Sequence, residues 1–228
     1  MGSGFNGKAI GVESVVAARE LPIVGAAGAV GAVGVGGDAG AEVAADVAAV
    51  VSVPDAERLV HLQFRRFAGC PVCNLHLRSI VRRHDEITAA GVKEVVVFHS
   101  PADELREHVA DLPFAVVADP DKRLYREFGV ESARRSLLSP RAWLPILRSL
   151  ARSLPRIVIG KDRAPAATPH GGRLGLPADF LIAPDGRVVA AMHGTHVYDQ
   201  WSVDRILELA RGHAHGHRNS RSQAPSAS

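Results

Sequence analysis

The fold is decided by residues 59–79, which read LVHLQFRRFAGCPVCNLHLRS. The first six residues form a short apolar run that is typical of a β-strand. Pro71 suits the first turn of a helix, where its missing N–H would have had no partner. Apolar residues then recur at helical spacing as far as Gly91, a natural helix end. The stretch therefore predicts a strand that leads, through a turn carrying two thiols, into a helix.

The rest of the middle of the chain alternates strands and helices. We expect strands at 92–98, 114–118, 180–182 and 188–192, and helices over 101–112, 119–129 and 201–211. Strands separated by helices are typical of a mainly parallel sheet covered on both faces. Pro184-Asp185-Gly186 predicts a tight turn between the last two strands, so the sheet should close with an antiparallel hairpin.

Composition divides the chain of 228 residues into three parts. It is 46% hydrophobic and 22% charged, which excludes disorder throughout and an integral membrane bundle. We expect residues 47–211 to form one globular domain. Residues 1–46 are a low-complexity extension rich in Ala, Gly and Val, expected to be poorly ordered, and residues 212–228 a disordered tail. A net charge of +3 does not argue for nucleic acid as a partner.

An insertion at about 132–172 is basic and amphipathic. Its cations, from Arg134 to Arg163, outnumber the single acid Asp162, and leucines recur at helical spacing. Such a helix packs over the sheet edge or the thiol site, or it docks a partner or an anionic membrane. We favour packing, and membrane contact is not expected.

Cys70 and Cys73 are the two cysteines of the chain. A disulfide scaffold needs more cysteines, spread wider, so this spacing favours a redox pair over two ordinary buried thiols or a metal site shared with His76. Helix N–H groups should lower the pKa of Cys70, and Arg65 and Arg66 are expected to add to this. Cys73, one turn further on, is placed to resolve an oxidised Cys70.

A proline begins the closing hairpin. Pro177 stands at the start of a predicted strand, where it removes no hydrogen bond from the sheet. A cis bond there would form a tight turn facing the thiols, whereas a trans bond would make it an ordinary strand entry. The sequence leaves both readings open.

The element order, with CxxC after the first core strand and a proline before the hairpin, resembles the thioredoxin fold. The stretches FAVVADPDKRLYREFGV at 114–130 and DFLIAPDGRVV at 179–189 resemble the AhpC/TSA-type peroxiredoxin-like family, whose members carry CxxC. The likeness covers about residues 53–211. It implies an α/β thioredoxin-like three-layer sandwich with a mostly parallel sheet. It also implies a thiol-dependent antioxidant oxidoreductase in which Cys70 attacks and Cys73 resolves.

One departure from the family pattern bears on the substrate. Typical members carry P-x-x-x-T/S-x-x-C, and here Gln63 and Phe67 stand at the proline and hydroxyl positions. The residues therefore favour disulfide chemistry over fast peroxide reduction.

The resemblance implies a hydroperoxide or disulfide substrate, with a thioredoxin-like protein or glutathione as reductant. It implies no bound cofactor or metal, and a cytoplasmic location. The alternative is a non-catalytic binding or redox-sensing module that docks a partner or membrane surface through its basic insertion.

Overall fold

The computed structural model describes residues 10–24, 49–109, 111–130 and 175–222, together with residues 147, 151, 155 and 172, and side chains as far as residue 216. Its strands are β1 (Arg19–Pro22), β2 (Val50–Val53), β3 (Leu59–Phe64), β4 (Val92–Phe98), β5 (Ala115–Ala118), β6 (Ala178–Ile182) and β7 (Val188–His193). Its helices are α1 (Pro71–Arg82), α2 (His84–Ala89), α3 (Ala102–Val109), α4 (Arg123–Glu127) and α6 (Val203–Ser222). Apart from the single residues named above, the basic insertion lies outside the described residues, so its structure stays a prediction.

The strand that leads to the thiols, β3, is the middle strand of a five-stranded sheet with the order β5-β4-β3-β6-β7. β3 pairs in parallel with β4, and β4 with β5. β6 is antiparallel to β3, and β7 is antiparallel to β6, so β6 runs opposite to its four companions. The expected α/β sheet with a closing hairpin is confirmed, as a mixed sheet.

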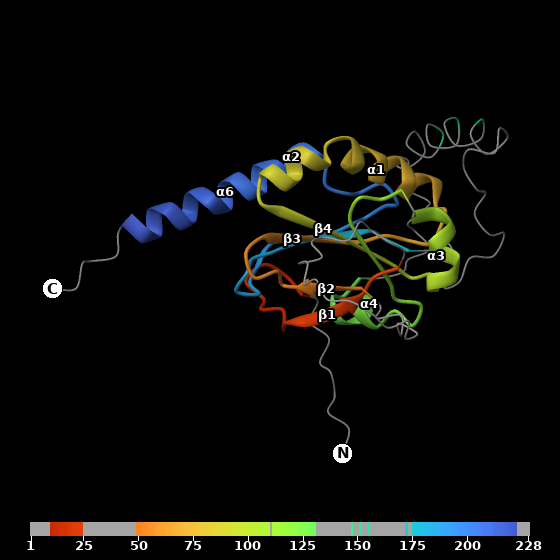
Figure 1. The fold of residues 1–228 in the computed structure, drawn as a ribbon, viewed down its shortest axis with the longest axis horizontal. Helices are drawn as coiled ribbons and strands as arrows, with labels where there is room; N and C mark the ends of the chain where they lie inside the picture. The colour runs from red at the N-terminus through yellow and green to blue at the C-terminus, as the bar shows by residue number, and fades with distance from the viewer. Residues whose placement is uncertain are drawn as a thin grey trace, which may run out of the picture.

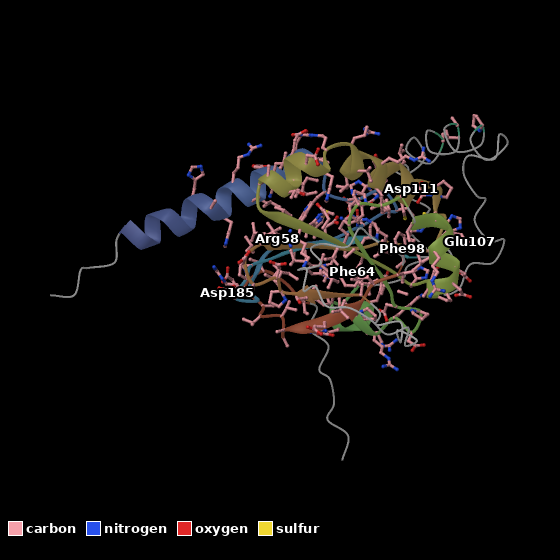
Figure 2. All side chains as sticks on the ribbon, viewed as in Figure 1. Arg58, Phe64, Phe98, Glu107, Asp111 and Asp185 are labelled. Carbon is pink, nitrogen blue, oxygen red and sulfur yellow. The ribbon has the colours of Figure 1, made fainter. Side chains whose placement is uncertain are left out.

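Two apolar cores separate three layers. Helices α1, α2, α3 and α6 pack on one face of the sheet, through residues such as Ile80, Leu105 and Ile206. The other face packs against α4 and against β1 and β2, which form a small sheet of their own. Figure 1 shows α1, α2 and α6 above the sheet and β1, β2 and α4 below it. Phe64 and Phe98 lie inside this body, while Glu107 and Asp185 lie at its rim (Figure 2).

The N-terminal extension differs from the expectation of a poorly ordered segment. Within it, β1 pairs antiparallel with β2, and Val16, Leu21 and Val24 are buried against the main body. The physical reason is that the lower face of the sheet is apolar and needs a cover, which this segment supplies. The Ala/Gly/Val-rich stretch that follows, residues 25–48, lies outside the described residues.

The helices also differ from their predicted extents, and α3 and α4 are shorter than the helices expected over 101–112 and 119–129. The single helix expected up to Gly91 is divided into α1 and α2 by Arg83, whose φ of −120° is not helical. α6 continues to Ser222, past the expected end at Arg211, so residues 212–222 are helical rather than a disordered tail. No proline interrupts the chain between 203 and 222, and the helix extends away from the body (Figure 1).

Candidate active site

The two thiols lie where a strand-to-helix turn places them. Cys70 is the residue before the first turn of α1, and its carbonyl accepts the first helical hydrogen bond, from the N–H of Asn74 at 2.9 Å. Cys73 lies one turn further along the same helix. Both thiols are reduced and buried, with 1% and 2% of their surfaces exposed. Neither cysteine is therefore open to solvent in this structure.

The surroundings favour a thiolate on Cys70 and a thiol on Cys73. Burial disfavours the Cys70 thiolate, but a hydrogen bond from Cys73, the charge of Arg66 and the N–H groups of Cys73 and Val72 outweigh it. Together they lower the pKa of Cys70 to about 6. Burial and the neighbouring Cys70 sulfur raise the pKa of Cys73 well above its usual value. One sulfur is thus suited to attack and the other holds a proton.

The two adjacent arginines do not share a role. Arg66 is the arginine whose charge stabilises the Cys70 thiolate, and its guanidinium lies 5.1 Å from the centre of the Phe67 ring. Arg65 instead donates hydrogen bonds to Asp179 (2.7 Å) and Gln63 (2.6 Å), inside the body. Arg66 therefore acts on the thiolate directly, whereas a buried carboxylate holds the Arg65 guanidinium, so a contribution of Arg65 to the thiolate stays a prediction.

The two prolines lie at the starts of two different elements, α1 and β6. Pro71 stands in the first turn of α1, as expected. Pro177 is buried just before β6, and its carbonyl accepts a hydrogen bond from Gly194. Within the described residues the cis peptide bond is Val53–Pro54, so the bond before Pro177 is trans. Pro177 is therefore a strand entry and not the tight cis turn that was the other reading.

Two glycines near the thiols are closely approached by side chains of other segments. Gly69, with a φ of +70°, precedes Cys70, and a Cβ there would lie 2.7 Å from Cε1 of His108. Gly175 lies against Arg66, since a Cβ there would be 3.2 Å from the Arg66 Cγ. The loop before Pro177 therefore contacts the thiol-facing arginine. Sequence reasoning missed both contacts, although a glycine directly before Cys70 was a signal for close packing.

The candidate metal ligand His76 is engaged by another group. Its Nε2 lies 3.3 Å from the Arg65 guanidinium, within hydrogen-bond distance. Burial and the Arg65 charge lower the pKa of His76 to about 3, so the ring is neutral and accepts from the arginine. In the described part of the chain, no group of three or more His, Cys, Asp or Glu side chains is arranged to hold a metal ion.

A pH titration of the reduced protein checks the assignment of the two thiols. We expect one thiolate to form with a midpoint near pH 6, whereas an unperturbed thiol ionises at about 8.5. Below the midpoint Cys70 is protonated and loses its nucleophilicity; above it the thiolate is present. The measurement is the ultraviolet absorbance of the thiolate, with Cys70→Ser as the variant that should lack the step. A midpoint at the value of free cysteine would contradict the assignment.

The geometry defines a thioredoxin-fold protein with a thiol pair at the start of its first core helix. Among family models, that of the AhpC/TSA antioxidant enzymes matches residues 79–196. The chain therefore belongs to the AhpC/TSA antioxidant enzyme family and is a peroxiredoxin-like thiol oxidoreductase. The match begins after Cys73, so the thiol pair lies outside it.

Solved structures of peroxiredoxins share the fold. A 2-Cys peroxiredoxin of Plasmodium vivax superposes with a TM-score of 0.58 at 12% identity, over 92% of this chain and 86% of its own. AhpC of Mycobacterium tuberculosis gives 0.56 at 12%, over 91% and 94%. The peroxidoxin BcpB of Mycobacterium tuberculosis gives 0.55 at 14%, over 89% and 97%. These identities show a common fold alone. No curated protein matches the chain.

Among the described residues, no helix combines the length and the apolar character needed to cross a bilayer.

Proposed function

We propose that this protein is a thiol-dependent antioxidant oxidoreductase that reduces hydroperoxides or disulfides through Cys70 and Cys73. The observation that carries the proposal is the asymmetry of the pair. Cys70 has its pKa lowered to about 6, while the adjacent Cys73 thiol, hydrogen-bonded to it, keeps its proton. An attacking thiolate beside a protonated resolving thiol is the arrangement that two-step thiol chemistry requires.

With a hydroperoxide, the Cys70 thiolate attacks the outer oxygen, the O–O bond breaks, and the alkoxide leaves and takes a proton to become an alcohol. The Cys70 sulfenic acid is then attacked by the Cys73 sulfur, which gives the Cys70–Cys73 disulfide and water. Two thiols are oxidised and one peroxide is reduced. A thioredoxin-like dithiol protein or glutathione restores the pair.

With a disulfide substrate, the Cys70 thiolate attacks one sulfur and expels the other as a thiolate. Cys73 then attacks the Cys70 sulfur, releases the second half of the substrate and closes the same intramolecular disulfide. We expect the reaction with a disulfide to be faster than the reaction with a peroxide. The reason is Phe67, whose side chain has no hydroxyl and stands at the position where typical relatives have the hydroxyl that would orient a peroxide. Its ring is 2% exposed and packs beneath Arg66. We place the protein in the cytoplasm, where a reducing poise keeps such a pair in its thiol form.

Peptide mass spectrometry tests the proposal. The reduced chain is treated with one equivalent of hydrogen peroxide or of oxidised glutathione, and then cleaved with trypsin after alkylation. Cleavage after Arg66 and Arg78 leaves both cysteines in one peptide, FAGCPVCNLHLR. We expect this peptide to lose two hydrogens and to escape alkylation, faster with the disulfide than with the peroxide. If both cysteines are still fully alkylated after treatment with hydrogen peroxide and also after treatment with oxidised glutathione, the proposal fails. The binding-module alternative is then favoured.

A further inference from the structure

A network of buried polar side chains lies on the helix-facing side of the sheet. In β3 the apolar residues Val60, Leu62 and Phe64 point to the lower core, so the alternate positions point toward α1. Those positions, with their partners on neighbouring elements, form what we call the ion network: His61, Gln63, Arg65, His76, Glu94 and Asp179, all buried. Two cationic side chains, His61 and Arg65, face two carboxylates, so the network is balanced in charge.

Asp179 is the point where the network's hydrogen bonds meet. Its Oδ1 accepts from Arg65 at 2.7 Å and lies 3.2 Å from Nε2 of His61. Its Oδ2 accepts from the backbone N–H of Trp201 at 3.0 Å. Burial disfavours the carboxylate, but the charges of Arg65 and His61 outweigh it and hold the pKa of Asp179 well below its usual range. The carboxylate is therefore ionised, and it keeps the guanidinium in place.

Glu94 holds the other end of the network. Its Oε2 lies 2.8 Å from Nδ1 of His61 and accepts from the amide of Gln63. Burial disfavours a charged His61, yet the carboxylates of Glu94 and Asp179 raise its pKa to about 9. His61 is therefore a cation at neutral pH, and the ring also stacks on Trp201 at 5.5 Å.

The network reaches the thiol helix through Arg65. One of its nitrogens lies 3.3 Å from His76, which is three residues after Cys73 on α1 and thus on the same side of that helix. The next residue along the chain is Arg66, the arginine whose charge acts on both thiols. The buried charges thus reach α1, the helix that carries the thiols, through the contact of Arg65 with His76.

We propose that Asp179 and Arg65 are positioning residues for the thiol pair: Asp179 holds the Arg65 guanidinium in a charge-balanced network, and this leaves Arg66 as the arginine that acts on Cys70. The inference rests on the proposed role of Cys70 and Cys73 as the reactive pair. If it is correct, removing the charge of Asp179 and removing the charge of Arg65 should change the stability of the Cys70 thiolate in opposite directions. Loss of the Asp179 charge leaves an uncompensated cation behind the pair and stabilises the Cys70 thiolate, whereas loss of the Arg65 charge leaves an anion and destabilises it.

The test compares Asp179→Asn with Arg65→Gln in the full chain. Thiolate absorbance is titrated against pH in each reduced variant, with circular dichroism as the check that each is folded. We expect the Cys70 midpoint to fall by roughly one pH unit in Asp179→Asn and to rise by about as much in Arg65→Gln. Asp204→Asn is the matched control, since this carboxylate is 81% exposed and pairs with Arg83 at the surface. Its midpoint should equal that of the unmodified chain.

Midpoints that move in the same direction, or that do not move in folded variants, overturn the inference, because a purely structural role predicts no reversal of sign. If either variant does not fold, Glu94→Gln takes its place. Glu94 contacts His61 and Gln63, so its charge acts on Arg65 less directly than that of Asp179. The Cys70 midpoint should fall by a smaller amount in Glu94→Gln than in Asp179→Asn. An unchanged midpoint in Glu94→Gln would also overturn the inference. The titration needs no turnover. Opposite shifts in a protein inert toward peroxide and disulfide would reject the proposed function and leave the network inference standing.

Discussion

Replacing Cys70 by serine is expected to abolish turnover. The hydroxyl of serine does not ionise near neutral pH, so the α1 N–H groups and Arg66 have no anion to stabilise and no nucleophile is formed. We expect the rate of peroxide or disulfide consumption, measured with a recycling dithiol, to fall by at least about a thousandfold. Circular dichroism should show an unchanged fold, since serine is close to cysteine in size.

Cys73→Ser is the informative control for this experiment. It keeps the attacking thiolate, so one equivalent of oxidant should still be consumed, and Cys70 should be trapped as a sulfenic acid or a mixed disulfide. Cys73→Ala would remove the hydrogen bond that Cys73 donates to Cys70, so we expect a higher thiolate midpoint in that variant. Full turnover in Cys70→Ser, with loss in Cys73→Ser, would mean that the two roles are exchanged.

The largest expected loss of stability is that of Phe64→Ala. Phe64 is fully buried on β3, and its ring lies 5.0 Å from Tyr125, 5.2 Å from Phe128 and 5.8 Å from Phe180. Truncation leaves a cavity that these rings can fill only in part, so we expect a cost of about 3–5 kcal/mol in the free energy of unfolding.

Urea unfolding followed by circular dichroism measures this cost. Val12→Ala is the matched control, because Val12 is 55% exposed, and its effect should stay within about 0.5 kcal/mol. A loss below about 1 kcal/mol in Phe64→Ala would show that the lower core can close around the missing ring.

Elements whose own residues carry a clear pattern could be predicted from the sequence. The strands at 59–64 and 92–98 were expected with the bounds that β3 and β4 have in the structure. Both are short, mostly apolar runs bounded by residues that break the pattern, which is typical of a strand. The helix start at Pro71 was predictable for a similar reason, because proline is favoured in the first turn and nowhere later in a helix.

Elements that depend on a distant partner were not predictable. β1 reads RELP, which has no strand pattern of its own, and it is ordered by pairing with β2 and by the apolar face that it covers. The break at Arg83 occurs without a proline or glycine, so tertiary packing decides it. The extension of α6 to Ser222 was missed because composition argued for a solvated tail.

For the site, spacing predicted where the thiols lie but not where the arginines point. Arg65 and Arg66 are equivalent in sequence, and their separation depends on Asp179, which β6 brings beside β3. One signal was present: His61 and Gln63 alternate with apolar residues in the predicted strand at 59–64. The structure buries both faces of this strand, and buried polar side chains need hydrogen-bond partners, which the network supplies.

The N-terminal segment crosses the lower face of the sheet from one edge to the other. Near its start, Ser14 accepts a backbone hydrogen bond from Val188 and Val16 donates one to Gly186, at the beginning of β7. Near its end, Val24 donates to Val116 on β5. A segment at the start of the domain is thus hydrogen-bonded to a hairpin that lies far later in the sequence. Such a topology has a high contact order, and we expect this closure to be completed only after the whole domain has been synthesised.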